Sequence, residues 1–414
     1  MSHHSDASRH PANKPFLYEN HDAYPHVRTQ HGIFQDHQTL SISDMPMESA
    51  IPPTTSLSSR AFSGSNFIDF ELPKMHLLKS ATLCMELVNN DTLVKSYLPV
   101  AFNLIDRFEI YFGSSLVETV LSEALYINHC TNNSFDKRKI LENATNTDAI
   151  AYKESGDYAY LDTNGTEVRE LYIRLYSLLS NSNLFLPGII EDIRIRVHFS
   201  AYSKWGLTGG LFPTPTVTPV LQKVELRLQH VVLANHNYQK LLNLYKTNQV
   251  NIKYLDHRFQ SYSISATKDV SINHVLSSIN GLISHMYILV REQNASGVNR
   301  INFKTLNKLY LTDSSGSSIH NGIVYTDQYL RGPYAADHFE HSNFFSKVPV
   351  YPIAFSNDVF TTVNTANCLG ARHFTSMEQL YIIPGETGNF EVLVLTYAHA
   401  QLHIKNGQVS VSRS

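Results

Sequence analysis

Apolar and polar residues alternate along several short segments of the chain, a pattern that predicts β-strands with one buried face. The alternation is regular in residues 68–72, 83–87, 107–112 and 193–199, where every second side chain is apolar. Strands with one polar face belong to antiparallel sheets, because strands of parallel sheets are buried on both faces and carry continuous apolar runs. The pattern therefore predicts an all-β fold in which antiparallel sheets pack face to face as sandwiches.

Two sandwiches of similar length are expected, separated by a short helical segment. Strand alternation returns at residues 223–229, and residues 238–245 then carry Tyr and Leu at helical spacing. Glycine and proline are concentrated in residues 205–219, so the first sandwich is expected to close just before them. We predict a first sandwich over residues 61–220 and a second over residues 221–414, where short apolar strands are separated by turn residues.

The first 60 residues follow neither a strand nor a helix period and are rich in His, Ser, Pro, Asp and Thr. Scattered aromatic residues such as Phe16, Tyr24 and Phe34 are typical of an extended arm that docks on a surface, whereas the polar composition is equally consistent with simple disorder. We therefore expect residues 1–60 to form an extended N-terminal arm rather than a domain of their own.

Composition and charge narrow the classes of function. Among the 414 residues, 43% are hydrophobic and 17% are charged, which excludes an intrinsically disordered chain. The net charge of −3 provides no basic field that could hold a phosphate backbone, so direct nucleic-acid binding is not expected. The three cysteines form no CxxC pair, which favours a reducing compartment, and the sequence shows neither a secretory signal nor a membrane-spanning apolar run.

The 21 histidines suggest metal binding, but their spacing argues against it. His399 and His403 share one face of a predicted strand at about 13 Å, too far apart for one zinc ion with bonds of ~2 Å. His338 and His341 lie in an acidic segment, yet the spacing places no third ligand beside them. A solvated strand face and a loop surface explain the two pairs better. We therefore predict no metal site and no cofactor.

Motifs for catalysis are also lacking. The glycines at 113 and 209–210 are followed by neither the lysine nor the helical pattern that phosphate binding requires. The sequence contains no G-x-S-x-G elbow, and the adjacent His129 and Cys130 would point apart on a strand. We predict no catalytic residues and no enzymatic activity.

Four segments carry motifs beyond simple alternation. Residues 104–120 hold a charged and apolar strand that ends in a glycine turn, and residues 171–200 hold an aromatic strand, a polar turn, the step Leu186-Pro187 and a long alternating strand. Residues 354–382 lead from a Phe-Ser strand through a polar turn to a further strand, and residues 398–412 form a closing strand with a Gly turn. In this order the segments resemble the double jelly-roll major capsid proteins of the adenovirus-like lineage, of the polinton-like virus, adintovirus or nucleocytoplasmic large DNA virus type.

This resemblance implies two consecutive eight-stranded antiparallel jelly rolls with short helices in the loops. It also implies a structural role, that of a major capsid protein which trimerises into pseudo-hexameric capsomers and tiles an icosahedral virus shell. The implied partners are two further copies of the chain, neighbouring capsomers, and penton and minor capsid proteins. The implied location is the virion, after assembly inside the host cell.

The resemblance also suggests places for the parts outside the sandwiches. The polar insertions of residues 128–168 and 293–302 are expected to leave the packed cores. In members of the family such loops form an outward crown. The arm of residues 1–60 is expected at the inner face of the capsid, where it orders on assembly.

Two alternatives come from other classes of protein. Two jelly rolls in one chain can form a bicupin-like metalloenzyme, but its metal site needs His-x-His with a Glu, and the sequence contains no His-x-His. The other alternative is a cell-surface or carbohydrate-binding sandwich, which requires an export signal that the sequence does not show.

Overall fold

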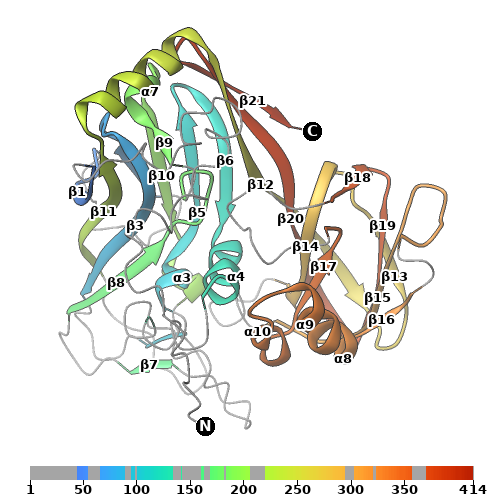
Figure 1. Ribbon diagram of the computed structural model, residues 1–414. Helices are drawn as coiled ribbons and strands as arrows, with labels where there is room; N and C mark the ends of the chain where they lie inside the picture. Colours follow the sequence, from blue (N-terminus) through green and yellow to red (C-terminus); the bar gives the residue numbers. More distant parts are fainter. Residues whose placement is uncertain are drawn as a thin grey trace, which may run out of the picture.

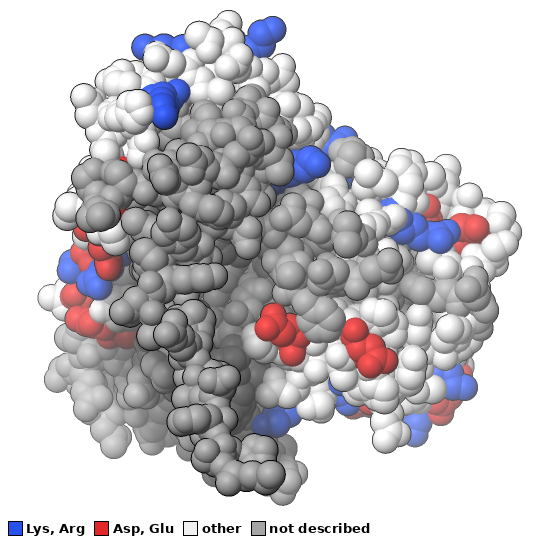
Figure 2. All heavy atoms as spheres, in the orientation of Figure 1, with Lys and Arg blue, Asp and Glu red and all other residues white. Residues whose placement is uncertain are grey.

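Two β-sandwiches stand side by side in this chain, and each consists of two antiparallel sheets (Figure 1). The computed structural model describes residues 44–54, 66–88, 95–97, 100–133, 141, 160–162, 168–180, 183–205, 220–293, 303–319, 323–356 and 370–413. Within these ranges, no helix is long and apolar enough to cross a membrane. On the described part of the face in Figure 2, basic and acidic side chains lie in small separate groups rather than in one broad basic field.

The first sandwich contains, among the described residues, two sheets of four main strands each. One sheet has the order β1-β11-β3-β8, with β1 at Met45–Ile51, β3 at Leu77–Val88, β8 at Val168–Arg174 and β11 at Val220–Val232. The other has the order β2-β10-β5-β6, with β2 at Phe67–Glu71, β5 at Ile105–Phe112, β6 at Ser115–Leu121 and β10 at Ile193–Phe199.

The second sandwich repeats this plan. Its first sheet has the order β12-β20-β14-β17, with β12 at Gln249–Ala266, β14 at Asn280–Glu292, β17 at Val350–Ala354 and β20 at Gly388–Lys405. Its other sheet has the order β13-β19-β15-β16, with β13 at Ile272–Val275, β15 at Leu306–Thr312, β16 at Tyr325–Thr326 and β19 at Gln379–Pro384. Two further strands extend the first sheet, β18 (Arg372–Thr375) beside β14 and β21 (Gln408–Arg413) beside β20.

Both sandwiches are jelly rolls. Counting the main strands along the chain, the first, eighth, third and sixth form one sheet of each sandwich, and the second, seventh, fourth and fifth form the other. This order is that of two interlocked Greek keys in an eight-stranded double sheet. The predicted fold of two consecutive eight-stranded antiparallel jelly rolls is therefore confirmed.

Short elements occupy the connections, as expected. They are the strands β4 (Lys95–Tyr97), β7 (Tyr160–Asp162) and β9 (Leu184–Phe185), and the helices α3 (Val100–Leu104), α4 (Ser122–Thr131), η2 (Leu186–Gly188), α6 (Tyr202–Trp205), α7 (Asn235–Thr247), α8 (Asp327–Tyr329), η3 (Leu330–Tyr334), α9 (Ala335–His338) and α10 (Asn343–Lys347).

The burial pattern of the strands explains the sequence pattern. In β10 the apolar positions are buried in the core while Arg194, Arg196 and His198 face outward. In contrast, residues 286–290 of β14 are apolar throughout and buried on both faces. The outer face of β14 is covered there, since the ring of Tyr287 lies 5.9 Å from that of Phe345 in α10. Alternation therefore marks strands with one covered face, and continuous apolar runs mark strands with two.

The strand pairing shows which residues belong to the first jelly roll. β1 lies within residues 1–60, the segment expected as an arm, and pairs with β11 in the first jelly roll, while residues 1–43 lie outside the described residues. β11 starts at Val220 and pairs with β3, so the first jelly roll includes strand residues beyond the predicted limit at 220. We propose that the boundary between the domains lies in α7, the helix expected from the spacing of residues 238–245.

Helix α7 packs closely against Gly188 of the first jelly roll. Tyr245 of α7 is fully buried, and its ring lies 5.4 Å from that of Phe185 in β9. A Cβ atom at Gly188 would lie 2.4 Å from Cδ1 of Tyr245. A side chain at this position therefore has no room unless the helix moves.

The substitution Gly188→Ala is expected to lower the free energy of unfolding by about 1–3 kcal/mol, the usual cost of overpacking a core. Gly332→Ala is the matched control, because a Cβ atom there meets nothing within 4 Å. Urea unfolding followed by far-UV circular dichroism measures both. Equal stability of the two variants would show that α7 adjusts without cost.

Candidate functional site

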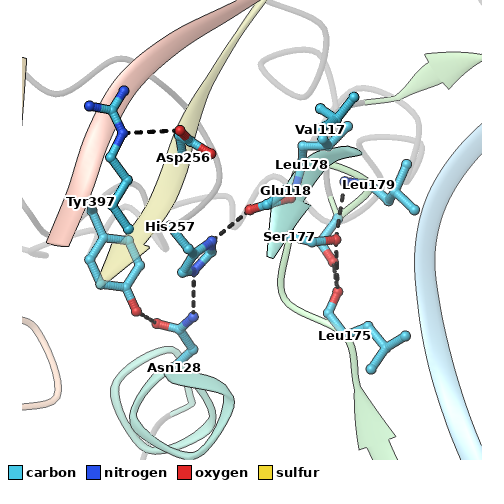
Figure 3. Close-up of polar contacts among 12 residues, drawn as sticks. Val117, Glu118, Asn128, Leu175, Ser177, Leu178, Leu179, Asp256, His257 and Tyr397 are labelled. Atoms are coloured by element: carbon cyan, nitrogen blue, oxygen red, sulfur yellow. Dashed lines mark hydrogen bonds and ion pairs between the residues drawn. The ribbon is translucent and has the colours of Figure 1, made fainter. Parts of the chain in front are cut away.

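The two jelly rolls meet along a line of buried polar side chains (Figure 3). β6 and α4 of the first jelly roll face β12, β20 and β21 of the second. Burying charged groups between two domains is costly unless every charge finds a partner. The polar side chains of this junction therefore determine how the two jelly rolls are positioned against each other.

Glu118 of β6 and His257 of β12 form the centre of the junction. Oε1 of Glu118 lies 2.6 Å from Nδ1 of His257, and Oε2 accepts a hydrogen bond of 2.8 Å from the backbone N–H of Leu178. The side chains of Glu118 and His257 are 0% and 6% exposed, so no substrate reaches them. Burial raises the pKa of the Glu118 carboxyl above its usual range, against the opposing effect of His257. The pair fastens the two jelly rolls and offers no accessible catalytic group.

Asn128 and Tyr397 complete this network. The Tyr397 hydroxyl donates a hydrogen bond of 2.6 Å to Oδ1 of Asn128, whose Nδ2 lies 3.2 Å from Nε2 of His257. Because the Asn128 amide nitrogen donates, Nε2 of His257 accepts, which places the ring proton on Nδ1 facing Glu118. Glu118 of β6 and Asn128 of α4, the latter oriented by Tyr397 of β20, thus hold a single tautomer of the histidine.

The C-terminal strand adds a second fastening. Nε of Arg413 in β21 lies 2.8 Å from Oδ2 of Asp256, and its Nη2 donates a hydrogen bond of 2.6 Å to the backbone oxygen of Val117 in β6. Nε of Arg258 lies 3.1 Å from the same Asp256 oxygen. Burial lowers the pKa of the Arg413 guanidinium, but Asp256 outweighs this effect and raises it overall. The carboxylate of Asp256 is thereby paired with two arginines at the edge of the junction.

Arg291 of β14 forms a third fastening. Its Nη1 lies 2.7 Å from Oε1 of Glu123 in α4, and its Nε lies 2.8 Å from Oε2 of Glu391 in β20. Burial tends to lower the pKa of Arg291, but the two carboxylates raise it overall. One side chain therefore joins a helix of the first jelly roll to two strands of the second.

His285 lies behind the network in an apolar setting. Its ring is fully buried and stacks on Tyr397 at 4.2 Å, and its Nδ1 lies 3.2 Å from the hydroxyl of Ser284. Burial, with smaller contributions from His257 and His399, lowers the pKa of His285 to about 3. The His285 imidazole is therefore neutral in the folded protein at neutral pH.

The burial of His285 predicts that the free energy of unfolding falls in acid. The unfolded chain takes up a proton on His285 near pH 6.5, whereas the folded chain does so only near pH 3, so stability is lost as the pH falls below 6.5. Between pH 7 and pH 5 we expect the wild type to lose about 2 kcal/mol of unfolding free energy relative to His285→Phe. Denaturant unfolding of both proteins at the two pH values measures this difference. Parallel losses in the two proteins would contradict it.

The histidines considered for metal binding have other partners. His403 lies on β20, as expected, with Nδ1 2.7 Å from Oδ1 of Asn251 and Nε2 2.7 Å from Oγ of Ser412. His399 is on the same strand, and His338 ends α9 with its ring 4.4 Å from that of Tyr334. Within the described part of the chain, no group of three His, Cys, Asp or Glu side chains could hold a metal ion.

His129 and Cys130 were expected on a strand, and this prediction is wrong. Both residues lie on α4 and are buried, and the His129 ring packs 5.3 Å from that of Phe102. The insertion expected over residues 128–168 therefore begins with the end of a core helix and ends with the start of β8. Most of its length, and residues 294–302 of the other insertion, lie outside the described residues.

The junction residues were not found from the sequence. A local signal exists in the charged run of Asp256, His257 and Arg258 inside a strand, because three ionisable residues in a row cannot all face solvent. Glu118 and Glu123 carry no such signal, since single acidic residues at strand and helix positions are common on surfaces.

Comparison with known proteins identifies the fold. No protein-family model and no curated protein matches the sequence. The chain is similar to PBCV-1 VP54, in a crystal structure fitted into a reconstruction of the virophage Sputnik, with 11% identity and a TM-score of 0.66 over 90% of this chain and 98% of that chain.

Two further solved structures are similar in fold along most of the chain. The Faustovirus major capsid protein matches with 9% identity and a TM-score of 0.63, over 94% of this chain and 98% of its own. A chain of the Sputnik virophage structure matches with 11% identity and a TM-score of 0.55, over 90% of both chains. The chain therefore has the double jelly-roll fold of these viral proteins along nearly their whole length.

Proposed function

We propose that this chain is a major capsid protein, three copies of which form a pseudo-hexameric capsomer that tiles an icosahedral virus shell. The observation that carries the proposal is that one chain holds two jelly rolls of the same strand order, fastened side by side by a buried polar junction. Three such chains around a threefold axis present six similar jelly rolls, which gives a hexagonal outline. The likeness in fold to the Faustovirus major capsid protein supports this reading.

The role within the proposal is mechanical rather than catalytic. A tile keeps its shape only if its two halves do not move against each other, and the three fastenings of the junction meet this need. The partners are two further copies, neighbouring capsomers, and penton and minor capsid proteins, and the protein resides in the virion. The arm of residues 1–60 would lie at the inner face of the shell, and the loops of residues 128–168 and 293–302 at its outer face.

A bicupin-like metalloenzyme is the alternative, because it also combines two jelly rolls in one chain. The sequence contains no His-x-His, and the described residues include no cluster of metal-binding side chains. These observations favour the capsid protein.

The mass of the purified protein in solution tests the proposal. Three chains of 46.9 kDa give a particle of about 141 kDa, which light scattering coupled to gel filtration measures directly. A stable monomer at all concentrations, carrying one equivalent of bound metal by elemental analysis, would favour the metalloenzyme instead.

A further inference from the structure

Two stretches of the sequence contain no acidic residue, and the fold places them side by side. They are residues 226–255 and residues 392–414. The first stretch includes α7 and the start of β12, and the second includes most of β20 and all of β21. β12 pairs with β20 over its full length, with Gln249 opposite Lys405, and β21 pairs with β20 in turn. One end of the molecule is therefore built from chain without carboxylate side chains.

The lysines of both stretches are exposed to solvent. We call them the lysine surface: Lys240 and Lys246 of α7, Lys253 of β12 and Lys405 of β20. Among the described residues, no ion pair involves any of these four. Lysines elsewhere are paired, as Lys304 is with Glu292 at 3.0 Å. In Figure 2 the small basic groups at the upper end of the view have no acidic group between them. The lysine surface thus carries positive charge that the described carboxylates leave uncompensated.

The carboxylates near this end have other partners. Asp44 is buried at the start of α7, where it accepts a hydrogen bond of 2.9 Å from the side chain of Asn237. Glu191 and Asp192 lie beside Lys74, which is outside the lysine surface. Their charges are therefore balanced without the four lysines.

Neutral hydrogen-bonding groups surround the lysines. α7 exposes Gln239 and Asn243, and β21 exposes Gln408 and Ser410. Amide and hydroxyl side chains contact phosphate oxygens of nucleic acids together with lysine, and such contacts carry no sequence information. The composition of the surface is therefore that of a site for a phosphate backbone.

A duplex backbone fits this surface better than a membrane or a single strand does. Membrane-binding helices insert an apolar face, but Leu241, Leu244 and Tyr245 of α7 are buried in the protein. Ile190, 72% exposed beside Gly407, is a single apolar side chain and forms no such face. Proteins that bind single strands stack the bases on aromatic side chains, and the exposed residues of α7 include no Phe, Tyr or Trp.

The lysine surface lies at the opposite end of the first jelly roll from α4. The turn before β6 contacts the loop below α7, since Gly113 donates a backbone hydrogen bond of 2.8 Å to Asp192 and Gly188 of the same loop touches α7. β6 leads from this turn to α4, where the insertion of residues 128–168 begins. Figure 1 shows α7 at the upper end of the view and α4 below it. If the insertion lies at the outer face of the shell, the lysine surface faces the interior.

We propose that the lysine surface binds the phosphate backbone of packaged double-stranded nucleic acid, without sequence preference. The inference rests on the proposed function, which turns this end toward the interior of the shell. The net charge of −3, from which nucleic-acid binding was not expected, averages over the whole chain and conceals this surface. Four lysines give weak binding for one copy, but three copies in a capsomer present the surface repeatedly to one polymer and raise the overall affinity.

Fluorescence anisotropy of a labelled duplex of about 30 base pairs, titrated with the full-length protein at about 50 mM and about 200 mM salt, tests the proposal. The variant Lys240→Gln, Lys246→Gln, Lys405→Gln is expected to bind about tenfold or more weakly at the lower salt concentration. Its affinity is also expected to depend less on salt, by up to about 1 in the logarithmic slope for each lysine that contacts a phosphate.

The matched control is the variant Lys268→Gln, Lys308→Gln, Lys347→Gln, which changes the net charge equally at exposed positions outside the lysine surface. This control is expected to bind like the wild type. Replacing Lys240, Lys246 and Lys405 with arginine keeps the charge and is expected to keep the affinity. Circular dichroism melting checks that every variant is folded.

The outcomes separate this inference from the proposed function. Equal losses in the two glutamine variants, a loss in the arginine variant, or a wild type that does not bind the duplex would overturn the inference, while a trimer mass would still support the capsid protein. Lysine-dependent binding to vesicles with about 30% phosphatidylserine, without binding to the duplex, would assign the surface to a membrane instead. A monomer that binds the duplex through these lysines would overturn the capsid proposal and leave the lysine surface as a nucleic-acid-binding site.

Discussion

Replacing Arg291 with alanine is expected to lower the free energy of unfolding by about 3–5 kcal/mol, because it breaks a buried ion pair at the junction. The substitution leaves Glu123 without its guanidinium partner at 2.7 Å, in a place where its side chain is only 3% exposed. It also removes the 2.8 Å contact to Glu391. Denaturant unfolding, with the slope fitted separately for each protein, measures the change.

The matched control for this prediction is Lys304→Ala. Lys304 also contacts two carboxylates, those of Glu292 and Glu386, but both are about half exposed. Surface pairs of this kind contribute about 0–1 kcal/mol. A loss below 1 kcal/mol in Arg291→Ala, similar to that of the control, would mean that the junction does not depend on this side chain.

The pair Glu118 and His257 is expected to show strong coupling. His257→Leu alone removes the imidazole partner of the buried Glu118 carboxylate and leaves it the hydrogen bond from the Leu178 N–H, and we expect a loss of about 3–5 kcal/mol. In the double variant, Glu118→Leu with His257→Leu, no charge is left behind, and two apolar side chains can pack together. We therefore expect the double variant to be more stable than His257→Leu alone.

A double-mutant cycle measures this coupling, and a value of about 1–3 kcal/mol is expected for two residues in direct contact. The two single variants and the double variant are unfolded in denaturant under the same conditions at pH 7. Strictly additive losses would contradict the description of Glu118 and His257 as one buried unit.

Much of the fold follows from local patterns in the sequence. Residues 193–199 were correctly predicted as a strand because β10 has one buried and one exposed face, and the alternation records this difference directly. Helix α7 was indicated in the same way, since its buried residues Leu241, Leu244 and Tyr245 follow a helical period. The jelly-roll order itself came from the resemblance of four segments rather than from the periodicity.

Other elements leave no periodic trace. Helix α4 is buried on nearly all sides, so its residues show no helical period, and its last residues were assigned to a loop. β1 has the opposite property: most of its residues are exposed, so no buried face marks it as a strand. The predicted limits at residues 60 and 220 place β1 and most of β11 outside the first sandwich, because the pairing of these two strands joins residues about 180 positions apart and leaves no local trace in the sequence.

The junction could not be derived from the sequence for a related reason. Glu118 and His257 are separated by 139 residues, and Arg413 and Val117 by 296. No local period carries information about such a contact, because it depends on how two finished domains are placed against each other.

Imaging of the purified protein in negative stain tests the capsid proposal most directly. Class averages are expected to show particles with threefold symmetry and a hexagonal outline, with six similar lobes from three chains. Uniform particles of a single two-lobed chain, at concentrations well above those used for light scattering, would contradict the proposal.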